Sequence, residues 1–275
     1  MNADVNHGTD TVFAGSIPEL YDTAMVPLIF EPYALDLARR VAALKPARIL
    51  EIAAGTGVVT RALARALPES SAIVATDLNP AMLERAQAIG TQRAVQWRSA
   101  DAMQLPFDDV TFDAVICQFG VMFFPDRPAA YAEARRVLAP GGTLMFNVWD
   151  RIEANDFAAV VTRALAALYP ADPPQFMART PHGYHDQAEI TSDLQRGGYA
   201  RAPVFETVAA RSRASSAAQA ALAYCQGTPL RNEIEARAPG GLEHATAVCT
   251  RALVAAFGSG PVDGAIRAHV VTVGI

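Results

Sequence analysis

Residues 47–63, "ARILEIAAGTGVVTRAL", carry the most informative pattern of the sequence. An apolar run from Ile49 to Ala54 carries one acid, Glu51, and then breaks at Gly55-Thr56-Gly57 before a helical pattern resumes. A glycine-rich turn between a strand and a helix lets backbone N–H groups approach a bound ligand closely. The stretch therefore predicts a buried strand, a ligand-binding turn and a helix, in that order.

Strand and helix patterns alternate from about residue 34 to residue 150. Apolar strand patterns lie at 47–54, 72–78, 94–101, 112–120 and 143–149. Helical patterns lie at 33–44, 58–67, 80–90 and 129–138, and the first has apolar residues at Leu35, Leu37, Val41 and Leu44. Such alternation predicts a doubly wound, mostly parallel sheet, covered on both faces, that binds ligands at the carboxyl ends of its strands.

Local signals define several element ends. Asn79 and Pro80 suit the start of a helix, and Gly90 suits its end. Pro140-Gly141-Gly142 is expected to turn the chain into the fifth strand.

The remaining chain has weaker signals and no obvious linker. We expect helices at 153–169, 187–199 and 216–257, strands at 203–210 and 265–274, and a proline-rich loop at 170–186. The prediction is a single domain over 1–275. Its parts are N-terminal cap helices (1–45), a cofactor-binding core (46–150), and substrate-side helices with the last two strands (151–275).

Composition excludes several classes of protein. The 275 residues are 51% hydrophobic and carry a net charge of −5, with Lys45 the only lysine, so a nucleic-acid partner is not expected. The start of the sequence lacks the features of a signal peptide, and no run of 18 apolar residues occurs, which predicts a cytoplasmic protein without a membrane partner. Cys117, Cys225 and Cys249 form no CxxC pair, so neither a disulfide framework nor a metal site is expected.

The glycine turn fits two cofactors, a nicotinamide dinucleotide or S-adenosylmethionine. The nicotinamide fingerprint G-x-G-x-x-G lacks its third glycine here, because Thr60 follows Gly55 and Gly57 at that position. Glu51 would repel a pyrophosphate but could meet the ammonium of a methionine moiety or orient the turn. A satisfied buried acid is the other interpretation of Glu51.

Two further acids follow the next two strands. Asp77 ends the second strand, 22 residues after Gly55, and could accept hydrogen bonds from a ribose diol. Asp101 ends the third strand and could accept from the exocyclic amine of an adenine. A helix N-cap is the alternative role for each.

Five ordered motifs, "LEIAAGTG", "ATDLNPAML", "SADAMQLPF", "FDAVICQFGVMFFPD" and "VLAPGGTLMF", resemble the class I S-adenosylmethionine-dependent methyltransferases. The similarity covers about residues 17–150 and is greatest to the small-molecule branch called type 11, which includes the C-methyltransferases of ubiquinone and menaquinone synthesis. The resemblance implies a Rossmann-like α/β fold in which two further strands complete a seven-stranded sheet with an antiparallel edge. Residues 216–257 would form a helical insert near its C-terminus.

The resemblance also implies a set of site residues. The cofactor would be S-adenosylmethionine, the product S-adenosylhomocysteine, and the partner a small-molecule acceptor. Tyr21 belongs to an N-terminal "YD" and could instead be a core aromatic residue, and Phe119 would face the acceptor. The implied cofactor contacts are Tyr21, Glu51, Ala53, Gly55, Gly57, Asp77, Leu78, Met82, Asp101, Ala102 and Gln118.

Methyl transfer from a sulfonium requires mainly that donor and acceptor be aligned. A base is needed only where the acceptor must lose a proton, and His182 and His185 are candidates, with surface loop histidines as the alternative interpretation. O- or C-methylation of a partly apolar molecule is expected, because Phe119, Val121, Met122, Phe123 and Phe124 follow the fourth strand.

Two other functions remain as alternatives: a non-catalytic S-adenosylmethionine-binding protein, and a nicotinamide-dependent oxidoreductase, which would lack a Tyr-x-x-x-Lys pair. A monomer and a homodimer are both open.

Overall fold

The computed structural model describes residues 10, 11, 15 and 17–275. The part of the predicted N-terminal cap at residues 1–9, 12–14 and 16 lies outside them. The chain divides into two compact units. Unit 1 takes the described residues of Met1–Phe30, Trp149–Gly183 and Ala209–Arg267. Unit 2 takes Glu31–Val148, Tyr184–Val208 and Ala268–Ile275. The single-domain organisation stays a prediction.

A seven-stranded sheet has the order β3-β2-β1-β4-β5-β7-β6. The four pairings from β3 to β5 are parallel, and an antiparallel hairpin completes the sheet, which confirms the predicted fold class. The boundary between the units falls within β6 and β7. The strands are β1 (Arg48–Glu51), β2 (Ala72–Asp77), β3 (Gln96–Ser99), β4 (Phe112–Gln118), β5 (Leu138–Trp149), β6 (Val204–Ala214) and β7 (Val262–Gly274).

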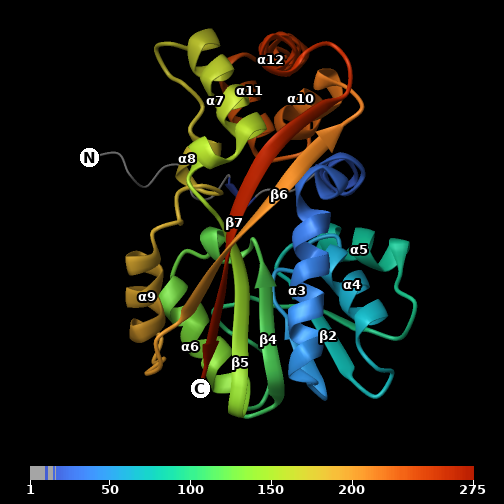
Figure 1. Ribbon diagram of the computed structural model, residues 1–275, viewed down its shortest axis with the longest axis vertical. Coiled ribbons are helices and arrows are strands. Elements are labelled where there is room, and N and C mark those ends of the chain that lie inside the picture. The colour runs from blue at the N-terminus through green and yellow to red at the C-terminus, as the bar shows by residue number, and fades with distance from the viewer. Residues whose placement is uncertain (1–9, 12–14, 16) are drawn as a thin grey trace. The chain divides into compact units, whose positions relative to one another are not determined.

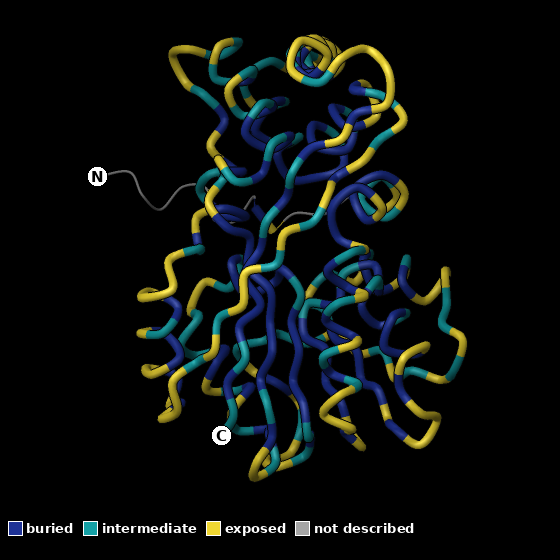
Figure 2. Tube along the Cα trace, viewed as in Figure 1, coloured by how far each residue is buried: buried dark blue, intermediate teal, exposed yellow. Residues whose placement is uncertain are grey.

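Helices cover both faces of the sheet in unit 2. On one face α3 and α4 pack over a buried apolar cluster that includes Ile49, Ile116 and Met145. On the other face Tyr131 of α6 stacks on Phe146 of β5, with ring centroids 5.5 Å apart. Figure 1 shows α3 and α4 on the opposite side of β5 from α6 and α9, and Figure 2 shows the central strands buried. The helices of unit 2 are α3 (Glu31–Leu44), α4 (Val58–Ala66), α5 (Pro80–Ile89), a 3₁₀ turn η2 (Val121–Phe123), α6 (Arg127–Val137) and α9 (Gln187–Arg196).

The predicted limits of α5 are confirmed by its capping. The side chain of Asn79 accepts the N–H of Ala81 at 3.0 Å, Pro80 stands at the first helical position, and Gly90 follows the last.

The apolar face of α3 differs from the predicted one. Leu35 and Leu44 are 54% and 44% exposed, whereas Leu37 and Val41 are fully buried. The buried face of α3 is therefore narrower than the leucine spacing predicted. An aromatic residue and two alanines contribute to this face, whereas two of the leucines point away from the core. The buried residues of α3 are Tyr33, Ala34, Leu37, Ala38 and Val41.

The predicted turn at Pro140-Gly141-Gly142 is wrong, since these residues lie within β5. Phe112 pairs with Leu138 but Ala114 pairs with Thr143, so a bulge absorbs the extra residues of β5. Gly141 at its centre has a φ of +80°, which favours glycine.

Unit 1 is mostly helical. The helix predicted at 153–169 is confirmed, and the region 216–257 is helical as predicted but divides into three helices. Among the described residues, no helix combines the length and the apolar character that a membrane span requires. The helices of unit 1 are α2 (Ile17–Leu20), the π-helix η1 (Tyr21–Phe30), a 3₁₀ turn η3 (Ile152–Ala154), α7 (Asp156–Leu168), α8 (Phe176–Arg179), α10 (Ala217–Gln226), α11 (Leu230–Arg237) and α12 (Leu242–Phe257).

The loop predicted at 170–186 contains the short helix α8. Arg179, its last residue, makes ion pairs of 2.6 Å with Asp10 and 2.8 Å with Glu233, both of which are buried. Buried carboxylates need such partners, so this ion-pair network fixes a helical turn that local sequence patterns do not reveal.

Candidate cofactor site

The turn between β1 and α4 has an unusual backbone. Ala53, Gly55 and Gly57 have φ values of +53°, +58° and +81°, the left-handed region that disfavours residues with a Cβ. A Cβ on Gly57 would lie 2.9 Å from the ring of Trp97 and 3.2 Å from the Cβ of Ala86. Gly57 is therefore required both by its conformation and by the close approach of α5 and β3.

Asp77 ties the end of β2 to this turn. One carboxylate oxygen accepts the N–H of Gly55 at 2.8 Å, and the other accepts the N–H of Asn79 at 2.8 Å. Burial raises the pKa of Asp77, although these two N–H groups act against the rise. Since Asn79 caps α5, the alternative of Asp77 as the helix cap is wrong.

Glu51, the last residue of β1, is buried, with 1% of its surface exposed. The hydroxyl of Thr60 on α4 donates to its Oε2 at 2.6 Å. Burial raises the pKa of Glu51 to about 8, opposed by Thr60 and Arg61 and reinforced by Asp77. The structure thus provides the partner of a satisfied buried acid, and Glu51 braces α4 against β1.

Asp101 lies two residues beyond β3 and not at its last residue. Its Oδ1 accepts the N–H of Met103 at 2.8 Å, a local turn, and the N-cap alternative has no support because no helix follows. Asp101 and Ala102 are both half-buried, so their edges can meet a ligand.

Leu78 and Met82 occupy contrasting positions near the turn. Leu78 is 63% exposed, an uncommon state for a leucine that follows a buried strand. Met82 is 4% exposed, and its Cε would lie 3.7 Å from a Cβ on Gly55. Met82 therefore supports the turn, whereas Leu78 presents an apolar side chain at the surface.

The end of β4 approaches the glycine turn closely. Gln118 is the last residue of β4, and Phe119 follows with a φ of +52°. A Cβ on Gly120 would lie 2.5 Å from the Cβ of Ala53 and 2.6 Å from the Sγ of Cys117. Sequence reasoning missed Gly120, and the only available signal was a glycine directly after an apolar strand.

Phe119 is buried against α3. Its ring meets that of Tyr33 edge to face, with centroids 5.4 Å apart. Cys117 is also buried, and burial raises its thiol pKa.

Tyr21 and His182 belong to unit 1, whereas His185 belongs to unit 2. The rings of Tyr21 and Phe30 lie 5.1 Å apart. The interpretation of His182 as a surface histidine is wrong, because it is 5% exposed and packs 6.0 Å from the ring of Trp149. Its Nδ1–H donates to the carbonyl of Asp150 at 2.9 Å, since a carbonyl can only accept.

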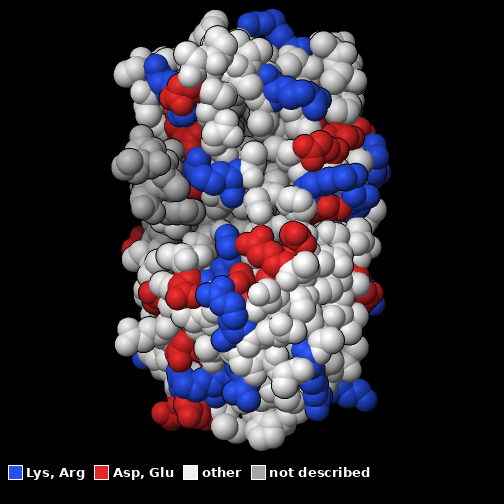
Figure 3. All heavy atoms as spheres, turned by 90° about the vertical axis from the view of Figure 1, so that its left-hand side faces the viewer, with Lys and Arg blue, Asp and Glu red and all other residues white. Residues whose placement is uncertain are grey.

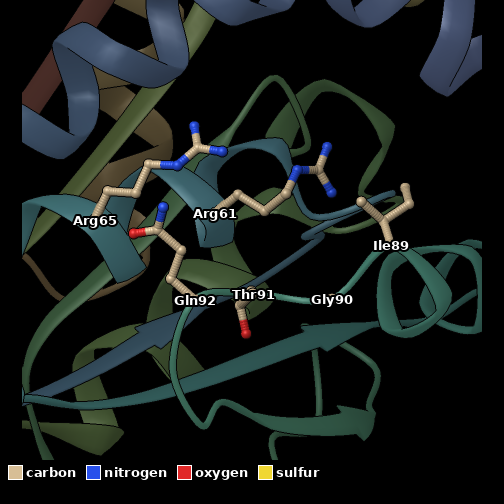
Figure 4. Close-up of a pocket in the computed structure, with 6 residues that line it drawn as sticks. All are labelled: Arg61, Arg65, Ile89, Gly90, Thr91 and Gln92. Atoms are coloured by element: carbon tan, nitrogen blue, oxygen red, sulfur yellow. The ribbon is translucent and has the colours of Figure 1, made fainter.

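A separate hollow of about 290 Å³ lies beside α4 and contains none of the predicted cofactor residues. Figure 4 shows the side chains of Arg61 and Arg65 extending from α4 above the segment that follows α5. Arg61 already donates to the carbonyl of Thr56 at 2.6 Å, so one of the two cations helps to hold the glycine turn. The lining residues are Arg61, Arg65, Ile89, Gly90, Thr91 and Gln92.

The surface charges are mixed. Figure 3 shows acidic and basic side chains interspersed on the face that it draws. Ion pairs such as Arg40–Glu206 at 2.6 Å and Arg211–Asp263 at 2.7 Å neutralise several arginines. Within the described residues, no group of three His, Cys, Asp or Glu side chains could hold a metal ion.

Comparisons with known proteins identify a methyltransferase domain in the chain. Residues 50–146 match the family described as "Methyltransferase domain". The chain is 39% identical over 117 residues to a demethylmenaquinone methyltransferase of Deinococcus radiodurans, a match that covers 42% of this chain and 48% of that protein. It is 30% identical over 165 residues to the ubiquinone/menaquinone biosynthesis C-methyltransferase UbiE of Dinoroseobacter shibae, covering 55% and 66%.

The chain spans between about a third and two thirds of the length of the curated relatives it matches. Among solved structures, the YcgJ protein from Bacillus subtilis superposes with a TM-score of 0.56 at 17% identity, covering 88% of this chain and 98% of that one. That likeness shows the fold. Through its methyltransferase domain, the chain belongs to the class I S-adenosylmethionine-dependent methyltransferases, and the relatives it resembles include ubiquinone and menaquinone C-methyltransferases.

Proposed function

We propose that this protein transfers the methyl group of S-adenosylmethionine to a small, partly apolar molecule. The observation that carries the proposal is the row of acids at successive strand ends. Asp101, Asp77 and Glu51 follow or end β3, β2 and β1, which are neighbours in the sheet. Asp77 also holds the left-handed turn at Gly55.

The residues fit the cofactor group by group in the order of the strands. Asp101 and Ala102, beyond β3, would meet the adenine edge, and the exposed Leu78 would pack on its ring. The carboxylate of Asp77 accepts backbone N–H groups at both oxygens, and its remaining lone pairs would accept the ribose hydroxyls.

The methionine moiety would lie where β1 meets β4. Ala53, Gly55 and Gly57 would approach it through their backbone, and Gln118 would meet it from the end of β4. Glu51, behind the turn, would be ionised by the arrival of an ammonium group, because a nearby positive charge lowers a carboxyl pKa.

When bound, S-adenosylmethionine supplies a methyl group on a positively charged sulfur. The chain's own contribution is to hold donor and acceptor in line and to exclude water, which can provide most of the acceleration. Tyr21 would cover the cofactor. His182 or His185 would take a proton where the acceptor must lose one.

The acceptor proposed first is the ring of a reduced quinone, methylated on carbon. Two relatives are named for demethylmenaquinone and for ubiquinone and menaquinone C-methylation, which supports this choice. The apolar residues after β4 also suit such a ring, since Phe119, Val121 and Met122 are all buried there. O-methylation of a phenol is the second possibility.

The test is methyl transfer from radiolabelled S-adenosylmethionine to a panel of acceptors by the purified full chain. The panel contains a short-chain demethylmenaquinone, chemically reduced, together with simple phenols. Label on the quinone ring supports C-methylation, and label on a phenol oxygen supports O-methylation. If S-adenosylhomocysteine binds but no acceptor is labelled, a non-catalytic binding protein becomes the better account. Gel filtration with light scattering decides between a monomer and a homodimer.

A further inference from the structure

Asn147, near the end of β5, has a buried carboxamide without a hydrogen-bond partner among the described residues. The residue is 0% exposed, and neither its Oδ1 nor its Nδ2 has a hydrogen-bond partner among the residues that the structure describes. Nearly all buried polar side-chain atoms in folded proteins are paired, because an unmet donor or acceptor loses its bonds to water without replacement. A leucine of similar size would avoid this penalty. The carboxamide is therefore better explained by a partner that comes from outside the fold.

The position of Asn147 points to the end of β4. Asn147 pairs in register with Gln118, the last residue of β4. Registered neighbours in a sheet turn their side chains to the same face, so the two carboxamides lie side by side. Gln118 is half-buried, whereas Asn147 is covered completely, so access to Asn147 from the strand ends passes Gln118.

The backbone is strained at Phe119, which hydrogen-bonds to the backbone of Asn147. The carbonyl of Asn147 accepts the N–H of Phe119 at 3.2 Å, and Phe119 has a φ of +52°. Left-handed conformations of residues other than glycine cost free energy and gather at binding and catalytic sites. This bond fixes the end of β4 beside Asn147.

The strand order indicates which ligand group would reach Asn147. The proposed contacts for adenine, ribose and methionine follow β3, β2, β1 and β4, and β5 is the next strand in the same direction. The methyl acceptor must lie beyond the methionine end of the donor, on that side. This step rests on the proposed function.

We propose that the side chain of Asn147 binds an oxygen of the methyl acceptor and so sets its orientation. A carboxamide donates through Nδ2 and accepts through Oδ1, which matches a hydroxyl or carbonyl group on an otherwise apolar ring. It carries no charge, so it orients the acceptor and does not remove a proton. The apolar side chains of Val121 and Met122 are buried in the turn that follows β4, and low polarity strengthens a hydrogen bond.

A crystal structure of the full wild-type chain with S-adenosylhomocysteine tests the inference without any turnover. We expect the carboxamide of Asn147 to hydrogen-bond to ordered water only, at a cavity beside the sulfur. A carboxamide bonded to protein groups would overturn the inference, because it would then be a structural residue.

The second test uses Asn147→Leu, with Ser212→Ala as a matched control. The hydroxyl of Ser212 on β6 is also fully buried and without a partner among the described residues. For Asn147→Leu we expect an unfolding temperature equal to or above that of the wild type and S-adenosylhomocysteine affinity within twofold. We expect kcat/KM for the reduced demethylmenaquinone to fall at least tenfold. Ser212→Ala should keep wild-type kinetics.

Two other outcomes separate the possible failures. If Asn147→Leu unfolds at a lower temperature with unchanged kinetics, the inference fails while the proposed function stands. If the wild type binds no S-adenosylhomocysteine, the proposed function itself fails.

Discussion

The two sides of the candidate site differ in how the fold treats their polar groups. On the donor side, each of the three acids has a partner within the protein: Glu51 has Thr60, Asp77 has Gly55 and Asn79, and Asp101 has Met103. On the acceptor side, the carboxamide of Asn147 has none among the described residues. The proposals thus imply that the donor side is organised before any ligand binds and that the acceptor side is completed by its ligand.

Breaking the glycine turn should have the largest effect. In Gly57→Ala the new Cβ would be 2.9 Å from Trp97, at a φ of +81°. We expect a loss of about 2–4 kcal/mol in the free energy of unfolding, from left-handed strain and overpacking. Urea denaturation measures it. Gly240→Ala is the control, since Gly240 has a φ of +74° and open space around it. If both variants lose the same free energy of unfolding, the close approach of Trp97 does not contribute to the loss.

Removing the carboxylate of Asp77, the proposed ribose contact, should weaken cofactor binding. Asp77→Ala is expected to reduce the binding free energy of S-adenosylhomocysteine by about 1–3 kcal/mol, from lost charge-assisted hydrogen bonds. Calorimetric titration of the folded variant gives the value. Asp113 is the matched control because its carboxylate also accepts two backbone N–H groups, those of Ala47 and Arg48, at the start of β4. Asp113→Ala should lose stability but keep its affinity, and an unchanged affinity in Asp77→Ala would remove Asp77 from the site.

The buried acid predicts a pH dependence of stability. The pKa of Glu51 is raised to about 8 in the folded protein, so between about pH 4.5 and 8 the folded state holds a proton that the unfolded state has released. Stability contributed by this group therefore falls as pH rises through that window, by at most roughly 1.4 kcal/mol per pH unit. Thermal unfolding at several pH values should show a flatter profile for Glu51→Gln than for the wild type. Parallel profiles would mean that Glu51 is ionised in the folded state.

The smallest effect should come from the exposed leucine. Leu78→Ala is expected to weaken S-adenosylhomocysteine binding by about 1 kcal/mol through lost apolar contact, with stability changed by less than about 0.5 kcal/mol. Leu35→Ala, at a similarly exposed position on α3, should change neither quantity. Competition binding with a fluorescent adenosine analogue can resolve a difference of this size. Equal affinities in the two variants would contradict a role for Leu78 in holding the adenine.

The donor side could be predicted because its signals are local in sequence. Gly55, Gly57 and Asp77 stand at fixed spacings from strand and helix patterns, and the strand order that brings Asp77 to Gly55 follows from the alternation of elements. The partner of Glu51 could not be predicted, because it depends on which turn of α4 faces β1.

The acceptor side depends on contacts between distant segments. The close approach of Gly120 to Ala53 and the pairing of Asn147 with Gln118 need the exact register of neighbouring strands. The burial of His182 depends on Trp149 and Asp150, some thirty residues earlier in the chain. In the same way, the bulge at Gly141 follows from strand pairing and not from the local Pro-Gly-Gly signal, which by itself indicates a turn.

Calorimetric titration of the wild-type chain with S-adenosylhomocysteine, and separately with NADH, shows which cofactor the glycine turn binds. We expect S-adenosylhomocysteine to bind in the absence of an acceptor, with a dissociation constant on the order of micromolar, because the donor side is already organised. We expect no binding of NADH. Binding of NADH without binding of S-adenosylhomocysteine would contradict the assignment of Glu51, Asp77 and Asp101 to a methyl donor.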